Sequence, residues 1–206
     1  MAQGKAHKSA AEKAIRLLRR RGGIIRTGEA LAIGIHPRTF YTLRDTGVLD
    51  RVSRGVYRLA EEKPLSNVDL VTVAARIPRA VICLISALAF HEITTQVPHT
   101  VSIALERNAE SPRIDFPPVS VHRFSRESLV AGIEQHVIDG VTIRIYSAEK
   151  TLVDCFKFRN KVGMDVVLEA LRLYMARGAF NVAELLKYAR ICRVERIMRP
   201  YLEAML

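Results

Sequence analysis

A helix that ends at a glycine and runs directly into a basic hairpin is the feature that most limits how this chain can fold. In "IHPRTFYTLRDTG", Pro37 suits the first helical position, Phe40 and Leu43 share one face, and Gly47 ends the helix. In the following "VLDRVSRGVYRL", apolar and polar residues alternate on both sides of Gly55, which suits a turn. This order predicts a helix followed by a two-stranded hairpin.

Three earlier elements complete the pattern. Apolar residues recur at helical spacing over residues 10–20, and two glycines end that run. A short extended piece at 24–26 and a short helix over 27–34 follow. The order helix, strand, helix, tight turn, helix and hairpin within about sixty residues is that of a winged helix-turn-helix.

The charge of the chain is concentrated in this same segment. Residues 1–60 hold 13 Lys and Arg against 4 Asp and Glu, a net charge of +9. Residues 61–206 hold 19 against 17, which leaves +2 of the total of +11. A basic segment beside a nearly neutral one is typical of a module that binds a polyanion, most often nucleic acid.

The predicted third helix and hairpin supply the expected contacts with double-stranded DNA. With Phe40 and Leu43 directed inward, the remaining side chains of the helix are expected on or near its outer face, within reach of base edges and phosphates. The alternative is that these charges merely form a solvated face, as charge runs usually do. The predicted DNA-binding residues are Arg38, Thr39, Tyr41, Thr42 and Arg44 on the helix and Arg51, Arg54 and Arg58 on the hairpin.

A second domain is predicted beyond a polar, proline-containing segment. β-branched residues alternate in three stretches up to residue 147, and Asp139-Gly140 within the last of them signals a tight hairpin. Ser147 suits the cap of a helix, and three further helical runs follow. The fold class is therefore α+β, strands followed by helices. The predicted boundaries are a DNA-binding domain over 1–60, a linker over 61–67 and a larger C-terminal domain over 68–206.

Patterns that support catalysis are sparse in this second domain. The chain has no Gly-Ser pair and no Asp-x-Asp or Asp-x-Glu, which a nucleotidyltransferase needs for phosphate and magnesium. His91-Glu92 begins like a zinc-helix motif, but Thr95 stands where the second histidine is required. We therefore predict no catalytic residue, no metal and no cofactor. The alternative is a nucleic-acid-processing enzyme that uses the basic segment to dock its substrate.

The cysteines and hydropathy indicate where the protein works. Cys83, Cys155 and Cys192 are far apart, odd in number and without a Cys-x-x-Cys pair, so we expect reduced thiols in or near the core. No run of 18 apolar residues occurs, and the N-terminus has no long apolar region. These features predict a cytoplasmic protein without a membrane partner.

Three stretches resemble the AbiEi-type antitoxins of type IV toxin–antitoxin systems, which act in bacterial abortive infection. They are "GIIRTGEALAIGIHPRTFYTLRDTGVLDRVSRGVYRL", "CLISALAFHEITTQVP" and "YSAEKTLVDCFKFRNKVGMDVVLEALRLY". The resemblance implies a winged-helix domain that represses its own operon by binding the promoter, and a C-terminal domain needed for antitoxin action. It also implies a nucleotidyltransferase-like toxin encoded nearby. On DNA, two copies of the chain are expected on paired half-sites.

The last of these stretches directs attention to one helix of the second domain. Lys150 and Asp154 are four residues apart, so they are expected either to pair locally or to contact a partner. Taken with the resemblance, they define an expected antitoxin surface of Lys150, Asp154, Lys157 and Arg159.

Overall fold

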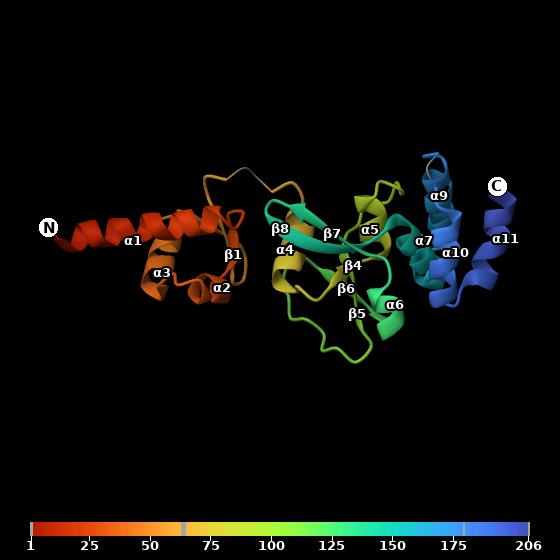
Figure 1. Ribbon diagram of the computed structural model, residues 1–206, viewed down its shortest axis with the longest axis horizontal. Coiled ribbons are helices and arrows are strands. Elements are labelled where there is room, and N and C mark those ends of the chain that lie inside the picture. Colours follow the sequence, from red (N-terminus) through yellow and green to blue (C-terminus); the bar gives the residue numbers. More distant parts are fainter. Residues whose placement is uncertain (1, 63–64, 179, 206) are drawn as a thin grey trace. The chain divides into compact units, whose positions relative to one another are not determined.

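The computed structural model describes residues 2–62, 65–178 and 180–205 (Figure 1). Contacts divide the chain into two compact units. The first extends to Pro78 and includes the hairpin tip Val137–Ile143, and the second contains Arg79–His136 and the chain from Arg144 onward. Of the predicted linker 61–67, residues 63–64 lie outside the described residues.

The first unit begins with the predicted order of elements. These are α1 (Ala2–Arg19), β1 (Ile24–Arg26), α2 (Thr27–Ala32), α3 (Pro37–Asp45), β2 (Leu49–Ser53) and β3 (Val56–Leu59). The three strands form an antiparallel sheet in the order β1-β3-β2. Gly55 adopts a φ of 75° in the β2–β3 turn, which the absence of a Cβ makes accessible. The expected winged helix-turn-helix is therefore confirmed.

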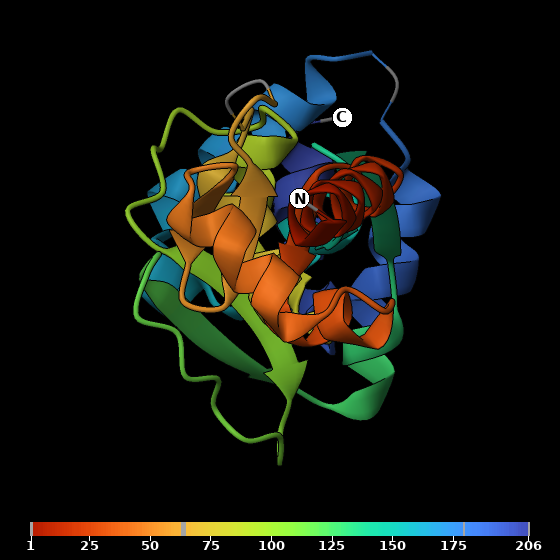
Figure 2. The same cartoon turned by 90° about the vertical axis from the view of Figure 1, so that its left-hand side faces the viewer.

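The core of this module joins its helices to its sheet. Leu18 of α1, Phe40 of α3 and Leu59 of β3 are fully buried, and the ring of Phe40 meets that of Tyr57 edge-on at 5.2 Å. Burying a side chain of this size contributes about 1.5–3 kcal/mol. Figure 2 looks along α1 and shows α2 and α3 beside it. This packing fixes which face of α3 points outward.

Helix α4 (Val68–Arg76) and the hairpin tip also belong to the first unit. The side chain of Asn67 caps α4 by accepting a hydrogen bond from the N–H of Leu70 at 3.3 Å. At the tip, Asp139 and Gly140 have φ angles of 48° and 75°, as the two central residues of a type I′ turn require. The carboxylate of Asp139 accepts hydrogen bonds from the N–H and hydroxyl of Ser66 at 2.8 and 3.1 Å. The predicted hairpin is confirmed.

A five-stranded mixed sheet underlies the rest of the chain, in the order β6-β5-β4-β8-β7. Strand β5 pairs antiparallel with β4 and parallel with β6, and β4 pairs parallel with β8. Helices α5 and α6 lie between these strands in sequence, and α6 was not expected from the sequence. The bounds are β4 (Val81–Ile82), α5 (Leu84–Phe90), β5 (Val101–Glu106), β6 (Val119–Phe124), α6 (Arg126–Val130), β7 (Ile133–Ile138) and β8 (Val141–Tyr146).

The helices that follow gather at one end of this sheet (Figure 1). Ser147 caps the first of them as predicted, because its hydroxyl accepts a hydrogen bond from the N–H of Lys150 at 3.2 Å. Cys83, Cys155 and Cys192 are buried and unpaired, as expected of core thiols. Together the two units confirm the α+β class. The bounds are α7 (Ala148–Lys157), α8 (Arg159–Val162), α9 (Met164–Met175), α10 (Val182–Ile191) and α11 (Glu195–Met205).

Candidate nucleic-acid interface

Helix α3 is fixed at both ends by residues that the sequence singles out. At its start, Nδ1 of His36 accepts a hydrogen bond from the N–H of Arg38 at 3.2 Å, and Pro37 occupies the first helical position. At its end, Gly47 has a φ of 73°, and the N–H of Val48 donates to the carbonyl of Leu43 at 2.9 Å. This is the glycine-terminated geometry that satisfies the last carbonyl groups of a helix. Both ends of α3 are therefore defined locally.

The outer face of α3 differs at one residue from the prediction. Arg38, Tyr41, Thr42 and Arg44 are exposed, but Thr39 is only 8% exposed. The prediction that Thr39 lies on the outer face is therefore wrong. Thr39 lies four residues before Leu43, and side chains at that spacing share one face of a helix, which here is the buried face.

Three of the exposed side chains on α3, those of Tyr41, Thr42 and Arg44, already have partners within the helix. The guanidinium of Arg44 lies 2.7 Å from the carboxylate of Asp45 and 4.8 Å from the centre of the Tyr41 ring. The hydroxyl of Thr42 donates to the carbonyl of Arg38 at 2.8 Å. These contacts restrict the side chains of Arg44 and Tyr41 before any ligand is present.

The arginines of the hairpin fall into two kinds. Arg51 and Arg54 are exposed. Arg58 lies directly opposite Asp50 in the β2–β3 pairing, and its guanidinium is 3.3 Å from that carboxylate. An opposite-charge pair at such a position stabilises the two strands, so Arg58 has a structural role as well as a charge.

Three cations of the module that have no carboxylate partner among the described residues lie on α3 and on the hairpin. Within the described part of the chain, no carboxylate lies at ion-pairing distance from Arg38, Arg51 or Arg54. The backbone carbonyl of Arg54 accepts a hydrogen bond from the guanidinium of Arg76, so the turn that carries this side chain is held in place. Three guanidinium groups without an ion-pair partner among the described residues thus lie on the exposed surface of α3 and the hairpin. There they can bind phosphates or acceptor groups of bases.

The expected antitoxin surface is not a single surface. The side chains of Lys150 and Asp154 are fully buried, so placing them on a surface was wrong. Helix α7 lies against α5, α9 and α10, and every residue from Lys150 to Phe156 is buried. Lys157 and Arg159 are half-buried, and Arg159 donates to the carbonyl of Phe156 at 3.1 Å. Of the four residues, these two retain contact with solvent.

Lys150 and Asp154 form the predicted local pair inside the core. Nζ of Lys150 lies 2.5 Å from Oδ2 of Asp154 and 4.0 Å from the centre of the Tyr146 ring. The thiol of Cys192 donates to the other carboxylate oxygen at 3.5 Å. Burial raises the pKa of Asp154, and the neighbouring ammonium opposes that rise. Cys192 was missed because it lies 38 residues from Asp154 in the sequence, and Tyr146 because it belongs to the preceding strand β8.

His91, which begins the incomplete zinc-helix motif, contacts the backbone of the protein. Nε2 of His91 lies 2.7 Å from the backbone carbonyl of Tyr146, at the end of α5. Among the described residues, no three His, Cys, Asp or Glu side chains come together as metal ligands would. In the described parts of the chain, no helix is both long enough and apolar enough to cross a membrane.

Comparisons with known proteins agree with this picture. The crystal structure of the RV2827C protein from Mycobacterium tuberculosis superposes with a TM-score of 0.50 at 16% sequence identity, over 91% of this chain and 77% of that one. At that identity the likeness concerns the fold alone. No curated protein matches the sequence significantly. Residues 12–60 match the family described as "Transcriptional regulator, AbiEi antitoxin". Over residues 12–60, this chain is therefore similar to the AbiEi antitoxin family of transcriptional regulators.

Proposed function

We propose that the protein is a transcriptional regulator that binds the promoter of its own operon and represses it. The observation that carries this proposal is the set of three guanidinium groups, on Arg38, Arg51 and Arg54, that face solvent on a helix-turn-helix and have no carboxylate partner among the described residues. A net charge of +9 over residues 1–60 supplies the general attraction to duplex DNA.

Helix α3 and the hairpin would have different roles in binding DNA. Helix α3 enters the major groove, where Arg38, Tyr41 and Thr42 meet base edges. The hairpin follows the adjacent backbone, where Arg51 and Arg54 bind phosphates without reading sequence. Arg44 is already held by Asp45 and Tyr41, so little side-chain entropy is lost when it binds.

We further propose that the regulator is the antitoxin of a type IV system, paired with a nucleotidyltransferase-like toxin from the same operon. The family match over residues 12–60 supports this role. Neutralisation would then belong to the C-terminal domain beyond the linker 61–67, with Lys157 and Arg159 of its α7–α8 segment the accessible cations to test. In this proposal the protein has no catalytic activity of its own.

Titration of the full-length protein with labelled DNA tests the regulator function. One duplex contains the promoter upstream of the gene, and a second has the same composition in shuffled order. We expect tighter binding to the promoter and a steep loss of affinity with salt, because each neutralised phosphate adds about −0.9 to the log–log slope. Equal affinity for both duplexes would refute sequence-specific regulation.

A further inference from the structure

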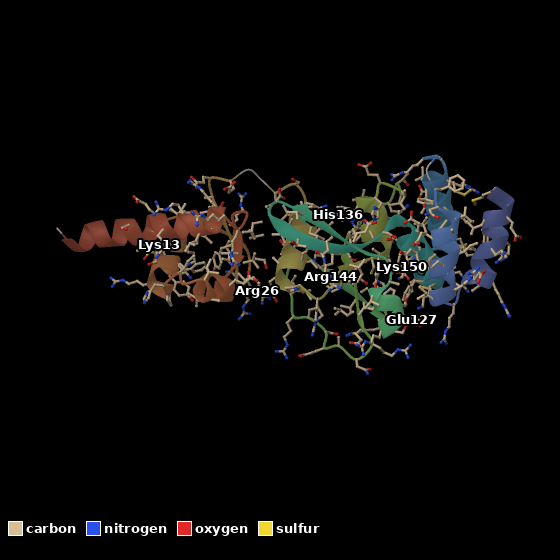
Figure 3. The ribbon with its side chains drawn as sticks, viewed as in Figure 1. Lys13, Arg26, Glu127, His136, Arg144 and Lys150 are labelled. Carbon is tan, nitrogen blue, oxygen red and sulfur yellow. The ribbon has the colours of Figure 1, made fainter. Side chains whose placement is uncertain are left out.

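A groove lies between α1 and the turn that leads into α3. It has a volume of about 210 Å³, and its walls include Lys13, Ala14 and Leu17 from α1 and Gly34, His36 and Thr39 from the turn and the start of α3. A water molecule occupies about 30 Å³ in the liquid, so the groove has room for an oxyanion with part of its hydration. Lys13 lies on α1 where that helix passes α3 (Figure 3).

Thr39 presents an unused polar group to this groove. Its side chain is 8% exposed, and no hydrogen bond to its hydroxyl is present among the described residues. A ligand oxygen in the groove would provide the missing acceptor.

The backbone at the start of α3 offers a second donor beside it. Pro37 has no N–H, the N–H of Arg38 donates to His36 Nδ1, and the N–H of Phe40 donates to the His36 carbonyl. In the first turn, the N–H of Thr39 is left without a partner in the described part of the chain. The N-terminal end of a helix also carries a partial positive charge, which favours an anion there.

Lys13 completes a donor set for a single negative charge. It is exposed, it lines the groove, and no described carboxylate pairs with it. The groove thus combines an ammonium, a hydroxyl without a hydrogen-bond partner and a helix N-terminus, and none of the described residues that line it carries a carboxylate.

We propose that this groove holds one backbone phosphate of the bound DNA, with Lys13 supplying charge and Thr39 supplying the hydrogen bonds. The inference rests on the proposed DNA-binding function and names a contact outside the outer face of α3 and the hairpin. A phosphate held at the start of α3 fixes the depth and direction of that helix in the major groove, and this contact does not depend on sequence.

Binding of full-length variants to the promoter duplex, over a range of salt concentrations, tests the proposal. Lys13→Gln should reduce the magnitude of the salt slope by about 0.9, because one fewer phosphate is neutralised. Thr39→Val keeps the shape of the side chain and removes the hydroxyl. It should lower affinity about tenfold at every salt concentration and leave the slope unchanged. Arg172→Gln, an exposed charge removal on α9, is the matched control and should change neither quantity.

A second measurement locates the phosphate. Single phosphates of the duplex are replaced one at a time by uncharged methylphosphonates, and one position should weaken the wild-type protein about tenfold while leaving Lys13→Gln unaffected. Thermal unfolding confirms that each variant is folded. A wild-type slope in Lys13→Gln, or no position at which the two proteins differ, would overturn the phosphate site while the regulator function stands. Failure of the wild-type protein to bind the promoter would overturn both.

Discussion

Nζ of Lys150 lies 2.5 Å from Oδ2 of Asp154, and both side chains are fully buried. The pair is one turn apart on α7 and is surrounded by the Tyr146 ring, the thiol of Cys192 and, through that thiol, the hydroxyl of Ser128 at 3.3 Å. Two ions removed from water pay a large desolvation penalty, which only close pairing and further hydrogen bonds offset. These contacts hold α7 against the end of α10 and against strand β8.

Breaking this pair on one side should strongly destabilise the protein. Lys150→Met leaves the carboxylate of Asp154 buried without its counter-ion, and the expected loss is about 3–5 kcal/mol of unfolding free energy. The double variant Lys150→Met/Asp154→Leu removes both charges and should recover most of that loss. Chemical denaturation of the three proteins measures the difference. A single variant as stable as the wild type would show that the pair does not hold the core together.

The hairpin arginines should differ in their effect on DNA binding. Arg54→Ala removes an exposed cation that has no carboxylate partner in the described part of the chain. It should therefore weaken binding to promoter and shuffled DNA by the same factor and reduce the salt slope by about 0.9. Arg58→Ala removes a cation already paired with Asp50, and its effect on the slope should be smaller. Anisotropy titrations at several salt concentrations measure both. Equal slopes for the two variants would contradict the distinction.

Helix α3 should instead determine sequence preference. Arg38→Ala or Thr42→Ala should reduce the difference between promoter and shuffled DNA by about 1–3 kcal/mol if the residue reads a base edge. Competition with unlabelled duplexes measures this difference directly. A variant that loses the same affinity for both duplexes would place its residue at the backbone.

Thr39 and Lys150 illustrate which features of this fold can be predicted from the sequence and which cannot. Elements bounded by special backbone geometry were predictable, because Pro37, Gly47 and the Asp139-Gly140 turn act locally. Thr39 was misplaced although its spacing from Leu43 contained the answer. The burial of Lys150 was not predictable, because charged residues are rarely buried and the groups that accommodate this one come from β8 and α10. The parallel pairing of β5 with β6 likewise depends on contacts distant in sequence.

Stability should fall in mild acid because of His122 on β6. Burial, together with the nearby charge of Lys161, lowers the pKa of this histidine. Below about pH 6.5 the unfolded chain takes up a proton that the folded chain does not, so the free energy of unfolding decreases as pH falls. Unfolding in urea at pH 7.5 and 5.5 should show a smaller decrease for His122→Gln than for the wild type. His99→Gln, at an exposed position, is the control. An unchanged pH dependence in His122→Gln would contradict this assignment.

The two proposed domains should separate DNA binding from antitoxin action. A fragment of residues 1–63 retains the three helices and the hairpin, together with most of the net charge. It should fold, though with low stability, because a domain of about sixty residues buries a smaller share of its surface than a larger one. It should bind promoter DNA more weakly than the full chain if the larger domain aligns two copies on paired half-sites.

The complementary fragment provides the opposite test. Residues 61–206 carry a net charge of only +2, so we expect no measurable DNA binding. Co-expression with the proposed nucleotidyltransferase-like toxin should show rescue of growth by this fragment. The double variant Lys157→Ala/Arg159→Ala should weaken rescue, because these half-buried cations are the members of the expected antitoxin surface that solvent reaches. Rescue by residues 1–63 alone, or DNA binding by residues 61–206 alone, would contradict the assignment of DNA binding to the first domain and of neutralisation to the second.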